Sequence, residues 1–164
     1  MIKITAKQIR ALREKTGAPM YRVKKVLEEL EGNENKAETI LKKEGFEKAA
    51  TKLDRQTNAG EIAVYVHHSG KVASVVEVYC ETDFVARNKL FRELAHNLAL
   101  QVAAMDPKNV DELMEQEFIK PSVLQAPLVK DSTKKVEDLV KEVIAKTGEN
   151  VRIGRIIRVE LGQE

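Results

Sequence analysis

Histidine and cysteine side chains bind metals, move protons or act as nucleophiles, and the sequence has four of them: the adjacent His67 and His68, the separate His96, and the only cysteine, Cys80. Successive side chains of a strand point to opposite faces, so His67 and His68, at a predicted strand end, are not expected to share one metal ion. His96 has no recognisable partner in its helix, and no base stands at a useful spacing from Cys80, which predicts an inert, half-buried thiol. These residues therefore predict neither a metal site nor covalent catalysis.

The sequence also lacks the glycine-rich and catalytic motifs of nucleotide and hydrolytic enzymes. It has no GxxxxGK[ST] loop, no GxGxxG after a strand, no HExxH and no GxSxG. We therefore expect no cofactor and no direct nucleotide binding. No apolar run approaches the roughly 20 residues of a membrane span, and the start MIKITAKQIR lacks the apolar stretch of a signal peptide. Together with a lone cysteine, this predicts a reduced, cytoplasmic setting without membrane contact.

Polar residues surround an aromatic one in ETDFVARN, residues 81–88, which follows the strand-like VASVVEVYC. Thr82 or Asp83 can cap a short helical turn there, and Asn88 can cap a longer helix. Capping leaves Phe84 unexplained. Its ring can turn inward, because burial removes roughly 150 to 250 Å² of an aromatic residue from water, or it can point outward as an anchor for another protein. The residue type alone favours the inward orientation.

Two hydrophobic periods predict the elements that position these residues. From Ile62 the period is two, and IAVYVHHSGKVASVVEVYC predicts a β-hairpin with a tight turn at Ser69 and Gly70. Helical spacing follows in NKLFRELAHNLALQVAAM, ended by Asp106 and Pro107, in the short VDELMEQ and in KKVEDLVKEVIAKTG. The final VRIGRIIRVEL alternates and predicts a third strand. The predicted fold class is therefore α+β, with helices packed on a small antiparallel three-stranded sheet.

Three helix signals follow one another in the first 45 residues. Each has a residue suited to open a helix, then apolar residues at helical spacing, and then a glycine. The opening and closing residues are Thr5 and Gly17, Pro19 and Gly32, and Asn33 and Gly45.

The predicted organisation is a three-helix module over residues 1–46, a polar and partly helical linker over 47–60, and an α+β core over 61–164. The module has few large apolar residues, so its own core is expected to be marginal. Such a module suits docking to another protein better than independent catalysis.

Charge is distributed unevenly along the chain. Residues 1–58 contain 14 of the 28 Lys and Arg and 9 of the 26 Asp and Glu, which leaves +5 there and −3 in the remainder. A basic N-terminal part favours an acidic partner, either RNA or an acidic protein face, although it can also be a solvated helical surface. An RNA- or ribosome-associated binding module is therefore an alternative function. Only seven Phe and Tyr, without interleaved basic residues, speak against nucleic acid.

Three stretches carry a resemblance to a known family. VEVYCETDFVARN closely resembles the signature of elongation factor Ts, the family that exchanges guanine nucleotide on elongation factor Tu. ALREKTGAPMYRVKKVLEE is similar to the first two helices of the family's ubiquitin-associated-like N-terminal module. PLVKD, followed by KTGENVRIGRIIRVELG, is similar to its C-terminal end. The resemblance spans nearly the whole chain in the expected order and implies elongation factor Tu as the partner, without covalent catalysis.

The resemblance implies a role for the tip Thr82, Asp83, Phe84 and Val85. In the family this tip enters the nucleotide-binding domain of the partner and disturbs its magnesium site. Phe84 would be the wedge and Asp83 its polar companion, which reverses the inward orientation favoured by residue type. Arg87 and Asn88 would support the corner.

The resemblance also implies that the N-terminal module docks on the same partner domain. Two residues depart from the family pattern TGAGMM, because Pro19 and Tyr21 replace a glycine and a methionine. The core is shorter than in the family between Asp106 and Leu124, which implies the short form and predicts a homodimer with two small sheets side by side. The expected docking residues are Leu12, Gly17, Met20 and Val23.

Overall fold

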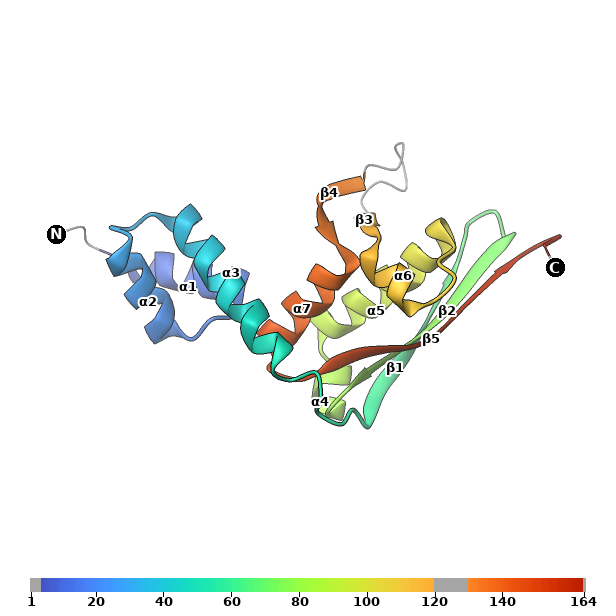
Figure 1. Cartoon of the computed structure of the whole chain (residues 1–164), viewed down its shortest axis with the longest axis horizontal. Helices are drawn as coiled ribbons and strands as arrows, with labels where there is room; N and C mark the ends of the chain where they lie inside the picture. Colours follow the sequence, from blue (N-terminus) through green and yellow to red (C-terminus); the bar gives the residue numbers. More distant parts are fainter. Residues whose placement is uncertain (1–3, 120–129, 164) are drawn as a thin grey trace. The chain divides into compact units, whose positions relative to one another are not determined.

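Figure 1 shows the computed structural model of the chain, which describes residues 4–119 and 130–163. The chain divides into two compact units. The first consists of Met1–Asp54 and Lys141–Glu149, and the second of Arg55–Val140 and Asn150–Glu164. The first unit is helical, and the sheets belong to the second.

Three helices begin the first unit, and each starts as the sequence predicts. Thr5 closes a capping box, Pro19 precedes the second helix, and the side chain of Asn33 caps the third. Gly17 ends the first helix in the left-handed conformation, with φ 72°. The helices are α1 (Ala6–Thr16), α2 (Met20–Glu29) and α3 (Glu34–Ala50).

The prediction that the third helix ends at Gly45 is wrong, because α3 continues to Ala50. Gly45 is instead a place of close packing. A Cβ atom on Gly45 would lie 3.2 Å from the Cβ of Ala145, which is tighter than most such contacts. The glycine is therefore explained by the approach of residues 141–149, which complete this unit.

The apolar core of the first unit is small. Leucine, valine and alanine supply its fully buried side chains, and four partly buried residues pack against them: Ile4, Ile9, Ala18 and Leu30. Such a core buries little area for its chain length. The buried residues are Leu12, Val23, Val26, Leu27, Ala37 and Leu41.

The second unit is built on a three-stranded antiparallel sheet in the order β1-β2-β5. The predicted hairpin is formed by β1 (Ala59–Val66) and β2 (Val72–Cys80), and Gly70 in its turn has φ 68°. The predicted third strand is β5 (Val151–Glu160), which pairs with β2. The α+β fold class expected from the sequence is confirmed.

Regular structure enters the predicted linker from both sides, since α3 continues to Ala50 and β1 begins at Ala59. The division into a module (1–46), a linker (47–60) and a core (61–164) stays a prediction about which parts of the chain fold on their own.

One face of the sheet is covered by α5 (Lys89–Met105), as Figure 1 shows. Alternate residues of β2 are buried, and Ser74 among them donates a hydrogen bond from its Oγ to the carbonyl oxygen of Ala99 at 2.6 Å. The helix ends at Asp106, as predicted. The core on this face includes Val76, Val78, Cys80, Phe91, Leu94 and Leu98.

A second, two-stranded sheet was not predicted. It follows α6 (Val110–Glu115) and joins β3 (Glu117–Ile119) to β4 (Lys130–Lys135). The next element is α7 (Val136–Thr147). The buried side chain of Gln101 on α5 explains how so short a strand is held. Its Oε1 accepts from the amide of Ile119 at 3.0 Å, and its Nε2 donates to the carbonyl oxygen of Glu117 at 3.1 Å. The PLVKD stretch, residues 127–131, lies mostly outside the described residues.

Candidate functional site

The corner, residues 81–88, connects β2 to α5 through the single turn α4 (Asp83–Ala86). Thr82 occupies the N-cap position with φ −132° and ψ 157°, although its side chain makes no capping hydrogen bond. Its carbonyl oxygen accepts from the amide of Ala86 at 3.1 Å. The Oδ1 of Asn88 caps α5 by accepting from the amide of Leu90 at 2.9 Å. The predicted capping role of Asn88 is confirmed.

Phe84 points out of this corner, with 90% of its surface exposed. It is the most exposed large apolar residue in the described part of the chain. The inward orientation favoured by residue type is therefore wrong. The next two residues, Val85 and Ala86, are each only 8% exposed, so they fill the space beneath the turn and leave the ring outside.

Two hydrogen bonds and one ion pair hold the corner in place. A carboxylate oxygen of Glu81 accepts from the amide of Asn150 at 2.6 Å and lies 3.6 Å from the guanidinium of Arg55. The buried thiol of Cys80 donates to the carbonyl oxygen of Thr82 at 3.2 Å. Cys80 is fully buried rather than half-buried, which fits a structural thiol. The corner is thus a fixed base for an exposed aromatic ring.

The α1–α2 loop, residues 16–21, is the second predicted contact region. Met20 is 45% exposed and Tyr21 is 73% exposed. Leu12 and Val23, which the resemblance also assigned to docking, are 2% and 0% exposed in the helical core. Side chains buried this deeply cannot contact a partner directly. We therefore expect Leu12 and Val23 to support the loop from the helical core instead. Tyr21, which replaces a family methionine, lies in the same predicted region and presents a more exposed side chain than Met20.

Gly17 gives the α1–α2 loop its path. Its φ of 72° is in the left-handed region, and a Cβ atom there would lie 2.9 Å from the Cα of Lys146. The Thr16 hydroxyl fixes the loop further. It donates to the carbonyl oxygen of Leu12 at 2.7 Å and accepts from the amide of Ala18 at 3.3 Å.

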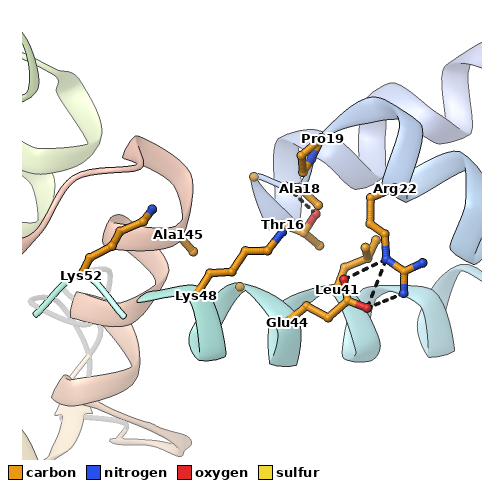
Figure 2. A pocket seen from close by; sticks show the side chains of 11 residues that line it. Thr16, Ala18, Pro19, Arg22, Leu41, Glu44, Lys48, Lys52 and Ala145 are labelled. Atoms are coloured by element: carbon orange, nitrogen blue, oxygen red, sulfur yellow. Dashed lines mark hydrogen bonds and ion pairs between the residues drawn. The ribbon is translucent and has the colours of Figure 1, made fainter. Parts of the chain in front are cut away.

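The α1–α2 loop lines a cavity of about 200 Å³, shown in Figure 2. Arg22 on α2 reaches Glu44 on α3 across its wall, and the guanidinium Nε donates to both carboxylate oxygens, at 3.0 and 3.2 Å. These hydrogen bonds lower the pKa of the Glu44 carboxyl and raise that of Arg22. Lys48 also extends along the cavity in Figure 2. The ion pair locks the first turn of α2, where Met20 and Tyr21 begin.

The outer face of the three-stranded sheet is apolar and exposed. Cross-strand neighbours form continuous rows on it, because Val64 pairs with Val75, which pairs with Ile157. Sequence analysis did not single out this face. A signal was present in the first strand, since IAVYV is apolar at both alternating positions, a pattern typical of strands covered on both sides. The exposed residues are Ile62, Val64, Val66, Ile157, Val159 and Leu161.

The two adjacent histidines lie differently from their prediction. β1 ends at Val66, so strand alternation does not apply to His67 and His68, and their ring centroids lie 4.0 Å apart. Tyr65 contacts His67 and also His96, at centroid distances of 6.5 and 6.2 Å. Within residues 4–119 and 130–163 no three His, Cys, Asp or Glu side chains gather in a way that could hold a metal ion. Within the same residues, no helix has the length and apolarity needed to cross a bilayer.

Comparison with known proteins identifies the family. The family model described as elongation factor TS matches residues 7–112 and 81–164, two overlapping stretches that cover most of the chain. The chain belongs to the elongation factor Ts family. The resemblance seen in the sequence is therefore confirmed.

Curated proteins named elongation factor Ts are similar over nearly their whole length. The protein of Oleidesulfovibrio alaskensis is 40% identical, covering 99% of this chain and 100% of its own. That of Nitratidesulfovibrio vulgaris is 41% identical, covering 98% of both chains. That of Thermotoga neapolitana is 39% identical, covering 99% of this chain and 100% of its own.

The chain is a short member of the elongation factor Ts family. The alignment with the Oleidesulfovibrio protein runs over 197 positions, whereas this chain has 164 residues, so that relative contains residues that this chain lacks. That the shortening falls in the core between Asp106 and Leu124 stays a prediction. All the elements that form and hold the corner are nevertheless present, namely β2, α4, α5 and β5.

Proposed function

We propose that this protein is a guanine nucleotide exchange factor in translation elongation, which binds elongation factor Tu with GDP and promotes GDP release. Its membership of the elongation factor Ts family supports this role. The observation that carries the proposal is the 90% exposure of Phe84 on a hydrogen-bonded corner. Fully burying such a side chain stabilises by about 1.5 to 3 kcal/mol, so leaving it in water forgoes a gain that a partner can supply.

The corner would act on the magnesium and phosphate site of the partner. Phe84 would enter the nucleotide-binding domain as a wedge, and the exposed Thr82 and Asp83 would make polar contacts that loosen the magnesium coordination. Val85 is buried beneath the turn, so it would hold Phe84 in its outward position rather than contact the partner. The exposed Arg87, together with the Asn88 cap, would complete the base of the wedge.

The thermodynamics need no covalent step. If this protein weakens GDP binding by some factor, GDP weakens the binding of this protein by the same factor. A ternary complex is therefore an obligatory intermediate, and incoming GTP releases the exchange factor by the reverse path. Each factor of ten in nucleotide affinity takes about 1.4 kcal/mol of differential binding, which a few side chains at an interface centre can provide.

The α1–α2 loop would make the second contact with elongation factor Tu. Met20 and Tyr21 are its exposed apolar side chains, and Gly17 sets the path of the loop. Pro19 fits this geometry despite its departure from the family pattern, since it occupies the N-cap of α2 with φ −59°. A second contact on one chain raises the effective concentration of the first.

Release of a fluorescent GDP analogue from elongation factor Tu tests the proposal. We expect wild type to accelerate release, and Phe84→Ala to reduce that acceleration by about 30-fold or more, the effect of losing roughly 2 kcal/mol at a hot spot. Ile40→Ala, at an exposed position of α3 away from the proposed contacts, is the matched control. The exchange function is lost if wild type leaves the release rate unchanged. The wedge alone is lost if Phe84→Ala exchanges as fast as wild type.

We also propose that the protein pairs with a second copy of itself through the outer face of its sheet. The continuous apolar rows of Val64, Val75 and Ile157 support this, because monomers rarely expose contiguous apolar faces of that kind. Light scattering at micromolar concentration should give the mass of two chains, and Val64→Lys should give the mass of one. A wild-type mass of one chain would contradict the dimer.

A further inference from the structure

The two ends of α4 line different hollows, the first with carboxylates in its lining and the second with cations. Asp83, the first residue of α4, lines a hollow of about 400 Å³ together with Glu61 and Glu77. Arg87, which follows α4, lines a groove of about 530 Å³ along α5. Phe84 therefore lies on a turn whose first residue, Asp83, lines one hollow and whose C-cap residue, Arg87, lines the other. We call the second hollow the basic groove; its lining is Arg87, Lys89, Arg92, Glu93, His96 and Asn97.

The packing of the fold does not account for the basic groove. Its α5 residues recur at intervals of three and four, so they lie on one side of the helix. The sheet is contacted by other positions, where Leu94, Ala95 and Leu98 are buried. The lining residues of the groove are exposed or partly exposed. They form a solvent-exposed face of α5 next to the proposed wedge. This face touches β1 through His96 with Tyr65 and through Arg92 with Glu61.

The cations of the basic groove are available to another molecule. Among the described residues, Arg87 forms no ion pair. Lys89 is 89% exposed at its side chain and lies 3.5 Å from the carboxylate of Glu93. Arg92 is 59% exposed and lies 3.6 Å from Glu61. Exposed pairs of this kind contribute about 0 to 1 kcal/mol, so they can rearrange around a new partner.

We propose that the basic groove receives an acidic segment of elongation factor Tu while Phe84 enters beside it. Three cations face one carboxylate in the lining, so the complementary occupant is negatively charged. An apolar residue beside a charged, solvent-exposed margin is the usual arrangement of a protein interface. The inference rests on the proposed exchange function and adds to it the charge of the partner surface and the orientation of the wedge.

The lining favours a protein segment over a nucleic acid. The described lining holds no Phe, Tyr or Trp for bases to stack on, and the ring of His96 already contacts Tyr65 at a centroid distance of 6.2 Å. Glu93 would repel a phosphate backbone, whereas a peptide segment with mixed charges can pair with both Glu93 and the cations. The opposite charges at Asp83 and Arg87 also define one orientation, because a partner turned by half a rotation would place like charges together.

Association kinetics with elongation factor Tu and GDP test the groove. The double variant Arg87→Glu, Lys89→Glu reverses two groove charges and leaves Arg92 with its neighbour Glu61. A glutamate at position 89, the first residue of α5, is compatible with the helix dipole, and circular dichroism checks the fold. The control Lys43→Glu, Lys71→Glu makes the same change in net charge at exposed positions outside the proposed contacts.

We expect the groove variant to associate about tenfold more slowly than wild type at low salt, with a smaller change in dissociation rate. The difference should shrink as salt rises toward 0.5 M, because charges separated by about a Debye length are then screened. The control should associate at nearly the wild-type rate.

Four outcomes would overturn the inference. They differ in whether the proposed exchange function is contradicted as well. If wild type does not bind elongation factor Tu, the proposed function falls and the groove falls with it. If wild type binds and exchanges nucleotide while the groove variant associates equally fast, only the groove is wrong. If the control slows association as much, net charge rather than the groove is responsible. If the groove variant loses binding to a single-stranded RNA oligonucleotide but keeps its association rate with elongation factor Tu, the groove is an RNA site.

Discussion

The corner and the α1–α2 loop both expose apolar side chains, but they are built differently. In the corner, Phe84 is 90% exposed on a single helical turn that hydrogen bonds tie to its neighbours. In the loop, Met20 is 45% exposed at the start of a regular helix, and hydrogen bonds from Arg22 to Glu44 hold the turn that follows it. The corner presents one ring alone on its turn, whereas the α1–α2 loop, held by Thr16 and by Arg22 with Glu44, presents two neighbouring side chains, Met20 and Tyr21. The two contacts are therefore expected to fail in different ways.

The largest effect on stability should come from Gly17→Ala in the loop. The added Cβ would lie 2.9 Å from backbone of Lys146 at a φ of 72°, so strain of about 1 to 2 kcal/mol and overpacking of about 1 to 3 kcal/mol combine. We expect the free energy of unfolding, measured by urea denaturation, to fall by about 2 to 4 kcal/mol. Gly70→Ala is the control, because its φ is 68° but no atom lies within 4 Å of its Cβ. Equal losses in the two variants would show that residues 141–149 do not pack closely on the loop.

A comparison of Val23→Ala with Met20→Ala separates the effect of the loop on protein stability from its effect on partner binding. Val23 is 0% exposed, so its truncation should lower the free energy of unfolding by about 1 to 3 kcal/mol. Met20 is 45% exposed, so its truncation should change stability by less than about 0.5 kcal/mol and weaken binding to elongation factor Tu by up to about tenfold. Denaturation and binding titrations measure the two quantities. A Met20→Ala variant with unchanged affinity would remove the loop from the proposed interface.

The smallest effect concerns acid stability next to the corner. Hydrogen bonds from the Arg155 guanidinium and then from its backbone amide lower the pKa of Glu77 from 4.5 to about 2. Since the folded pKa is depressed, the pair stabilises the protein above pH 4.5, and that contribution is lost as pH falls from 4.5 to about 2. Urea midpoints between pH 7 and 2 should therefore fall more for wild type than for Glu77→Gln. Parallel profiles would exclude the pair as a contributor to acid sensitivity.

The sequence predicted the fold correctly where a side chain bonds to backbone groups within a few residues of itself. Thr5, Asn33 and Asn88 cap the helices expected of them, and Gly17 ends α1. Gly45 misled, because its lack of a side chain serves a contact with Ala145, a hundred residues later in the chain. Tertiary contacts of this kind leave no local trace in a single sequence.

The second sheet was missed for a related reason. β3 has only three residues, and Gln101 on a distant helix supplies hydrogen bonds to its backbone, so no alternating pattern had to be encoded locally. A glutamine within an apolar helical face was the available signal.

The contact residues show how far the resemblance reached. Residue type favoured burial of Phe84, and the family likeness gave the correct outward orientation. The same likeness grouped Leu12 and Val23 with Met20, because a shared motif gives positions without separating buried from exposed side chains. Only the structure shows which of these side chains are exposed on the surface of their helix.

The composition of the first unit has a consequence for the order in which the protein folds during its synthesis. Its buried cluster comes entirely from α1, α2 and α3, so these helices can condense as soon as they leave the ribosome. The segment Lys141–Glu149, which packs against Gly17 and Gly45, becomes available only when most of the 164 residues have been translated. The contacts of Gly17 and Gly45 with residues 145 and 146 would therefore form late, well after the three N-terminal helices have been synthesised.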